Sequence, residues 1–186
     1  MKEDKYLQKA IFIFKTEGLS IPIDTIAEKI GVTKKTLYNN FESKDGLIKR
    51  CMEKVLHDFC TSVECLNDTS KDVQECFIQG INAARNYFRE ISPVFLNEML
   101  KFYPLLANDD HNLGYKFFIE QLEKNIIRGQ RENVYREDID ASLIAGYIAY
   151  SIFAYFRKSV MMNNKSSAEH YFKQVIDYNL KALLIS

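Results

Sequence analysis

Residues 24–44 read DTIAEKIGVTKKTLYNNFESK, and this stretch decides how the rest of the chain is interpreted. Apolar residues recur over residues 24–30 at three- and four-residue spacing, which predicts a short helix. Gly31 ends it, because glycine enters the left-handed conformation of a tight turn without a steric penalty. Thr33 is expected to cap a second helix over residues 34–40. The pattern indicates a helix-turn-helix, whose second helix suits the DNA major groove.

The second helix has one buried and one polar side. Leu37 is expected to face the core, which leaves the polar residues around it for contacts outside the protein. Lysine can donate to guanine O6 and N7, asparagine can pair with adenine, and threonine can meet a thymine methyl. Any one of these side chains could equally be an ordinary surface residue. As a set, they predict base contacts from Lys34, Lys35, Thr36 and Asn39.

The segment IAEKIGVTKKTLYNNFESKDGL, residues 26–47, resembles the DNA-binding signature of the TetR family of bacterial transcriptional regulators. The resemblance implies an all-helical homodimer in which a small ligand releases DNA. By position and by the resemblance, Thr33, Tyr38 and Lys44 would contact phosphates, which set register without reading sequence. Pro22 departs from the family, which commonly has a phosphate-contacting Ser or Thr near this point. The matching positions are Ile26, Ala27, Gly31, Val32, Thr33, Thr36, Leu37, Tyr38, Phe41, Lys44 and Leu47.

Charge is unevenly divided along the 186 residues, although the formal net charge is zero. Residues 1–50 hold ten Lys or Arg against seven Asp or Glu, whereas the remainder holds fifteen against eighteen. A charged face is usually only solvated. Here the basic excess coincides with the helix-turn-helix, which is the electrostatic pattern of a DNA-binding segment.

Helical periodicity covers most of the chain and predicts an all-α fold. We expect a three-helix DNA-binding domain over residues 1–48 and a helical bundle for effector binding and dimerisation over residues 49–186. Breaks are expected at residues 67–70, 108–114 and 163–167. Further helices are expected over residues 3–17, 44–65, 71–90, 94–102, 115–130, 141–156 and 168–184.

The connection at residues 128–140 resembles one that the family places before its last long helices. Relatives commonly have glycine where Asn133 stands, and asparagine is the next-best residue for a left-handed backbone. Asp138 or Asp140 would open the following helix, where negative charge is favourable.

The helix expected over residues 141–156 is apolar nearly all round, which predicts burial by its own domain and by a partner subunit. Together with the final helix it would form a four-helix dimer interface. The run is shorter than the roughly 20 residues of a membrane span, and no secretory signal is recognised. We therefore expect a cytoplasmic protein without a membrane partner.

Aromatic residues are frequent after residue 70, as in proteins that hold small ligands in apolar cavities. The set favours a flat, apolar or amphipathic effector, although any single aromatic is more often core than pocket. The candidate pocket residues are Phe77, Arg85, Phe88, Phe95, Glu98, Phe102, Phe118, Gln121, Tyr147 and Ser151.

Other functions find less support in the sequence. An enzyme would need a constellation such as a Gly-rich phosphate loop or GxSxG, and none is recognised. We expect no catalytic activity, metal or cofactor. The alternative is a helical adaptor that no longer binds DNA, against which Lys34, Lys35 and Lys44 speak.

The four cysteines lack zinc-site spacing and predict reduced thiols on helix faces. A redox-sensing thiol stays open as an alternative, because exposure and pKa decide reactivity. Taken together, the sequence predicts a ligand-responsive regulator that binds a palindromic operator as a homodimer. Repression is the commoner expectation from the resemblance, and activation stays open.

Overall fold

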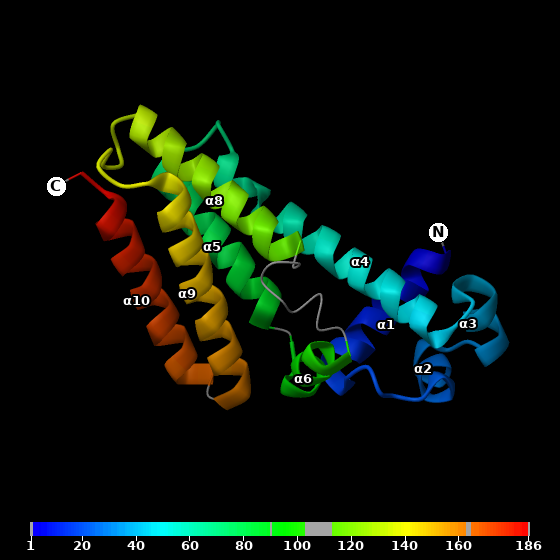
Figure 1. Ribbon diagram of the computed structural model, residues 1–186. Coiled ribbons are helices and arrows are strands. Elements are labelled where there is room, and N and C mark those ends of the chain that lie inside the picture. Colours follow the sequence, from blue (N-terminus) through cyan, green and yellow to red (C-terminus); the bar gives the residue numbers. More distant parts are fainter. Residues whose placement is uncertain (1, 90, 103–112, 163–164, 186) are drawn as a thin grey trace. The chain divides into compact units, whose positions relative to one another are not determined.

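The computed structural model describes residues 2–89, 91–102, 113–162 and 165–185 (Figure 1). Over these residues the regular structure is helical, which confirms the expected all-α fold. By contacts the chain divides into two compact units. The first comprises Met1–Asp58 and Glu90–His111, and the second comprises Phe59–Arg89 and Asn112–Ser186.

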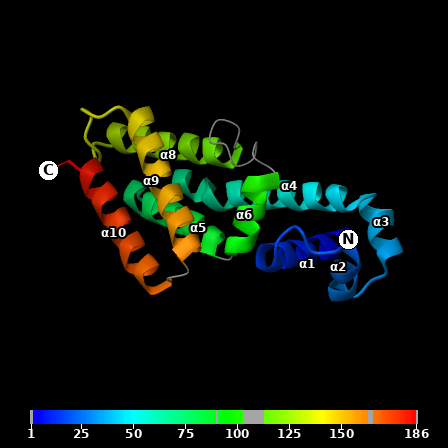
Figure 2. The same cartoon turned by 60° about the horizontal axis from the view of Figure 1, so that its bottom comes forward.

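The first unit contains α1 (Lys2–Glu17), α2 (Ile23–Ile30), α3 (Lys34–Phe41), the part of α4 (Lys44–Val63) up to Asp58, and α6 (Pro93–Phe102). The helix-turn-helix pair, α2 and α3, forms neighbouring ribbons at the blue end of the chain (Figures 1 and 2). Phe14, Leu37, Leu47 and Phe95 are among the side chains buried in its core. Helix α6, which is remote in sequence, therefore packs into the core of this first unit, which is called the head below.

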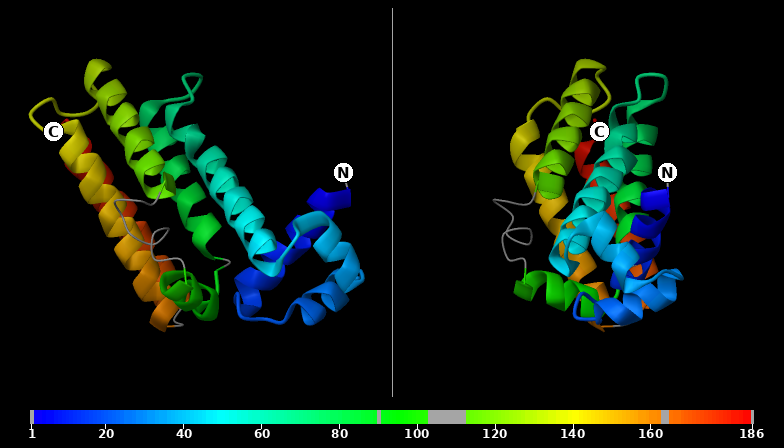
Figure 3. Two further views of the ribbon diagram at one scale, coloured as in Figure 1. Left: turned by 45° about the vertical axis from the view of Figure 1, so that its right-hand side comes forward. Right: turned by 90° about the vertical axis from the view of Figure 1, so that its right-hand side faces the viewer.

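The second unit contains η1 (Glu64–Asn67), α5 (Val73–Arg89), α8 (Leu113–Arg131), α9 (Ala141–Met162) and α10 (Lys165–Leu183). Helices α9 and α10 run side by side in opposite directions, and α8 packs against α9 (Figures 1 and 3). The buried Asn125 donates hydrogen bonds to the carbonyls of Leu66, at 2.7 Å, and Val73, at 3.2 Å. This amide joins α8 to the connection before α5.

Two local predictions in the second unit are confirmed. Asn133 has a φ of 54°, so it does adopt a left-handed backbone. Asp140 rather than Asp138 caps α9, because its Oδ1 accepts a hydrogen bond of 2.9 Å from the Leu143 N–H. Asp138 is instead paired with Arg136.

Several expected boundaries were wrong. α9 extends to Met162 rather than residue 156, and α10 begins at Lys165, inside the expected break. Ser166 and Ser167 suggested a loop, but serine is acceptable in the first turn of a helix. α8 begins at Leu113, and α4 ends at Val63 before a 3-10 turn. The rest of the break expected at residues 108–114 falls outside the described residues. None of the described helices could span a membrane.

Candidate nucleic-acid interface

The turn between α2 and α3 depends on the backbone of Gly31. Its φ of 85° and ψ of 39° are left-handed, and its N–H donates to the carbonyls of Ala27 and Glu28. The Val32 N–H also donates to the Ala27 carbonyl, at 2.9 Å. These bonds satisfy carbonyls at the end of α2 and end the helix in a tight turn. The predicted glycine turn is confirmed.

Thr33 begins the recognition helix, as predicted. Its Oγ1 accepts a hydrogen bond of 3.1 Å from the Thr36 N–H, and the two threonine hydroxyls lie 2.9 Å apart. Ser43 caps α4 in the same way, accepting from the Gly46 N–H at 2.9 Å. Both caps use side chains next to the helix they start, so a local sequence signal was sufficient to find them.

The two sides of α3 separate as the sequence predicted. Leu37 and Phe41 are buried, whereas Lys34, Lys35, Tyr38 and Asn39 are exposed and Thr36 is half-buried. An α-helix with such an exposed polar side fits the width of the major groove. The assignment of individual base and phosphate contacts to these residues stays a prediction.

Lys34 is held by a partner that the sequence did not reveal. Its Nζ donates to Asp24 Oδ2 at 2.9 Å, and both side chains are exposed to solvent. The hydrogen bond to Asp24 raises the pKa of Lys34. The two residues are ten apart and lie on different helices, so no local spacing rule could have indicated the pair.

Glu98 on α6 binds the loop between α1 and α2. Its carboxylate accepts hydrogen bonds from the backbone N–H groups of Leu19 and Ser20, the latter at 3.0 Å. Burial would raise the pKa of Glu98, but these hydrogen bonds and the charge of Lys44 hold it below its usual value. The candidate phosphate-binding Lys44, half-buried at the start of α4, therefore acts electrostatically on this carboxylate.

The ten candidate pocket residues are divided between the two units. Phe95, Glu98 and Phe102 belong to the first unit, where Phe95 is a core residue and Phe102 is exposed. The others belong to the second unit, and the side chain of Phe88 falls outside the described residues.

Within the second unit, Phe77 and Phe118 are core residues and Tyr147 is exposed. Gln121 is buried and accepts a hydrogen bond of 2.8 Å from Asn67 through its Oε1. The Arg85 guanidinium lies 5.2 Å from the centroid of the Phe172 ring, and the Ser151 hydroxyl donates to the Ile148 carbonyl at 2.8 Å.

An aromatic cluster forms in the second unit. The rings of Phe59 and Tyr87 have centroids 5.3 Å apart, and those of Tyr115 and Phe153 are 5.0 Å apart. Phe118 lies about equally close to Phe59 and Phe153, at 6.1 Å from each. Four elements contribute these rings, and of the five residues only Phe118 was among the candidate pocket residues named from the sequence. These five residues, Phe59, Tyr87, Tyr115, Phe118 and Phe153, form the aromatic cluster of the second unit.

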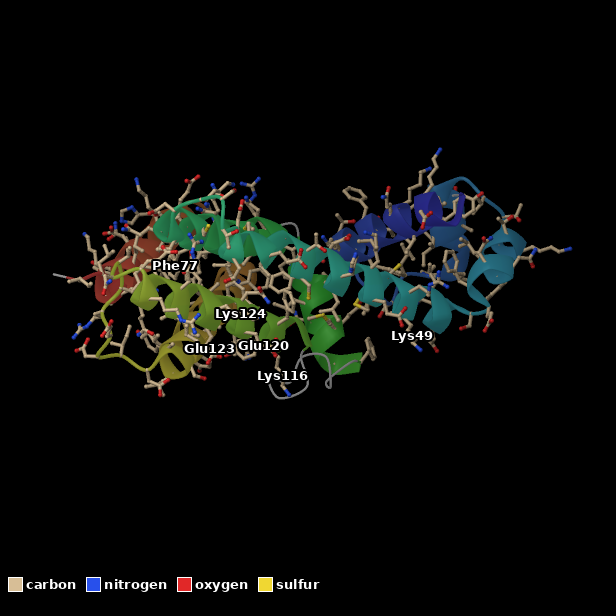
Figure 4. The ribbon with its side chains drawn as sticks, turned by 90° about the horizontal axis from the view of Figure 1, so that it is seen from above. Lys49, Phe77, Lys116, Glu120, Glu123 and Lys124 are labelled. Atoms are coloured by element: carbon tan, nitrogen blue, oxygen red, sulfur yellow. The ribbon has the colours of Figure 1, made fainter. Side chains whose placement is uncertain are left out.

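Carboxylates on α8 and the cysteines are the residues that could suggest enzyme, metal or redox chemistry. Glu120 and Glu123 lie along α8 with Lys116 and Lys124, whereas Phe77 belongs to the core (Figure 4). Burial raises the pKa of the Cys51, Cys60 and Cys65 thiols, to about 12 for Cys51, which disfavours the reactive thiolate. No cluster of possible metal ligands is found within the described part of the chain.

The capped turn and exposed polar helix define a helix-turn-helix DNA-binding protein. Residues 7–51 match the model of bacterial regulatory proteins of the tetR family. This match confirms the resemblance predicted from the sequence. None of the curated proteins matches the chain significantly.

Many solved structures match this chain, and the three described here cover nearly all of it. The TetR-family transcriptional regulator PfmR from Thermus thermophilus is 20% identical, with 97% of this chain and 99% of that chain covered and a TM-score of 0.69. A TetR-family regulator from Streptomyces coelicolor is 19% identical, with 98% and 97% covered and a TM-score of 0.75. SmeT, the repressor of a multidrug efflux pump of Stenotrophomonas maltophilia, is 16% identical, with 99% and 91% covered and a TM-score of 0.73. The fold is that of TetR-family regulators, which supports a DNA-binding regulator.

Proposed function

We propose that this protein is a ligand-responsive transcriptional repressor that binds a palindromic operator as a homodimer. The observation that carries the proposal is the exposed polar side of α3, a helix that begins directly after the Gly31 turn and the Thr33 cap. Lys35 and Asn39 would read bases there, together with Lys34 and Thr36. Thr33, Tyr38 and Lys44 would bind phosphates. Residues 1–48 would act as the DNA-binding domain and residues 49–186 as the effector and dimerisation domain.

The surface of α9 supports the homodimer. Leu143, Tyr147 and Tyr150 are 76%, 61% and 62% exposed, and their spacing of four and three residues places them on one side of the helix. On the neighbouring α10, Tyr178 is 66% exposed. Large apolar groups aligned in this way usually mark an interaction site. In a two-fold symmetric dimer, α9 and α10 of both subunits would bury these side chains in a four-helix interface. The same symmetry would match a palindromic operator.

The aromatic cluster of the second unit supports a flat, apolar or amphipathic effector. Its rings meet at tilted and edge-on angles, from 54° to 87°, and a planar apolar ligand would pack against them with the same preferred geometries. An effector would release DNA only by binding the DNA-incompetent state more tightly than the DNA-ready one.

The direct test is selection of duplex DNA from a random pool by the wild-type protein, followed by binding measurements on the selected duplex across a salt series. We expect a palindromic consensus, nanomolar affinity and a steep loss of affinity with salt, since phosphate contacts release counterions. A pool that yields no consensus would favour the adaptor. Aromatic and amphipathic compounds would then be screened for release of the selected duplex.

A further inference from the structure

An ion pair joins the two helices of the helix-turn-helix. Asp24 stands in the first turn of α2, and Lys34 is the first residue of α3. Asp24 Oδ2 and Lys34 Nζ are 2.9 Å apart, within hydrogen-bond distance. The pair therefore lies at the end of the recognition helix that enters the groove in helix-turn-helix proteins.

The pair leaves Lys34 able to bind DNA. A lysine ammonium has three N–H donors, and Asp24 takes one of them. The remaining donors can reach acceptors such as guanine O6 and N7. A free lysine loses much of its rotamer freedom when it binds a base, and a lysine already held by a carboxylate loses less.

Asp24 acts differently toward a DNA backbone. Binding to random DNA depends almost wholly on phosphate contacts. An exposed carboxylate beside the recognition helix repels those phosphates and competes with them for the Lys34 ammonium. Its presence should therefore weaken binding wherever Lys34 finds no matching base.

We propose that Asp24 is a positioning residue that sets DNA specificity: it holds the Lys34 ammonium for donation to a base and disfavours binding to random sequence. This inference rests on the proposed function, because it presumes that α3 reads DNA. It adds a residue outside the recognition helix to the determinants of specificity.

The test compares wild type with Asp24→Asn on the duplex selected by the wild-type protein and on a random-sequence duplex. We expect random-duplex affinity to rise about 2- to 5-fold, as one exposed charge interaction allows. Operator affinity should fall by about 2- to 10-fold, within the range of a lost base contact. The salt dependence of binding to random DNA should become steeper, by about one released counterion per subunit.

Two further variants separate position from charge. Asp24→Glu keeps the charge but shifts the carboxylate by one methylene, and with it the Lys34 ammonium. Operator affinity should therefore fall while random-duplex affinity stays unchanged. In a Lys34→Ala background, Asp24→Asn should no longer weaken operator binding. Glu17→Gln is the matched control, because it removes another exposed ion pair, with Lys29 at 2.6 Å, that joins α1 to α2 and does not involve α3. It should leave the ratio of the two affinities unchanged.

Each contrary outcome has a clear meaning. If Asp24→Asn changes both affinities by the same factor, or changes neither, Asp24 is only a solvated surface charge and the inference is overturned. Selection of a consensus by wild type would leave the proposed function standing in that case. If wild type selects no sequence, the proposed function fails and the inference fails with it. Thermal melting of each variant establishes that the domain is folded.

Discussion

The Glu98 carboxylate accepts a hydrogen bond from the backbone N–H of Ser20 at a distance of 3.0 Å. The two residues are 78 positions apart, yet both belong to the first unit. A second bond, from the Leu19 N–H, makes the same carboxylate the acceptor for two successive amides in the loop before α2. The loop that leads into the helix-turn-helix is thus held by α6, a helix that the sequence assigned to the other domain.

Replacement of Glu98 by Gln should lower the free energy of unfolding by about 1 kcal/mol. The side chain stays partly exposed, so solvent screening puts the value below the roughly 1.5–3 kcal/mol of hydrogen bonds to a charged group. Chemical denaturation of the variant and wild type at neutral pH measures the difference. An unchanged stability would mean that water replaces the carboxylate without cost.

The same bond should make stability depend on pH. Because the folded-state pKa of Glu98 lies below its ordinary value of 4.5, the unfolded chain binds more protons in the acidic range. This contribution is fully present above pH 4.5 and is lost as the pH falls through the lower, folded-state pKa. Between neutral pH and pH 3, wild type should therefore lose more stability than Glu98→Gln. Parallel curves for the two proteins would contradict this assignment.

Gly31→Ala should destabilise the head by about 1 kcal/mol, because an alanine must adopt a left-handed backbone there. No atom lies within 4 Å of the added Cβ, so steric overlap contributes nothing. Gly31→Asn is the matched variant and should cost less, since asparagine tolerates this conformation. Equal losses for the two variants, measured by thermal unfolding, would point to a cause other than φ.

Lys35→Ala should cost on the order of 1–3 kcal/mol in operator binding if Lys35 contacts a base. Lys116→Ala removes an exposed lysine from α8 and serves as the control (Figure 4). Binding is measured on the selected duplex and on random DNA. An equal loss on both would demote Lys35 to a phosphate contact.

Tyr150→Glu should convert the proposed dimer to a monomer, because it places a charge on the exposed apolar side of α9 formed with Leu143 and Tyr147. Phe12→Glu is the control, since Phe12 is similarly exposed, at 69%, but lies on α1 in the first unit. Sedimentation analysis of both variants and wild type reports the mass directly. A wild-type monomer, or a Tyr150→Glu variant that stays dimeric, would rule out this interface.

Local signals were enough to predict the helix-turn-helix. Gly31, Thr33 and Ser43 act on residues within four positions of themselves, so their roles can be read from spacing. Helix ends without such signals were less predictable. α10 begins at Lys165 although asparagines and serines suggested a longer break. The candidate pocket was the hardest feature to predict from the sequence, because aromatic residues look alike there whether they line a cavity, fill a core or face solvent.

The sequence by itself determined the order and type of the helices, the turn at Gly31 and the polar side of α3. These features depend on backbone conformation and on neighbours one or two helical turns away. Only the tertiary structure decided that Glu98 binds the loop of the head, that Asp24 holds Lys34, and that Tyr150 is exposed on α9. The physical reason is that each of these depends on the path of the chain between distant residues or on what packs beside a helix, which local spacing does not encode.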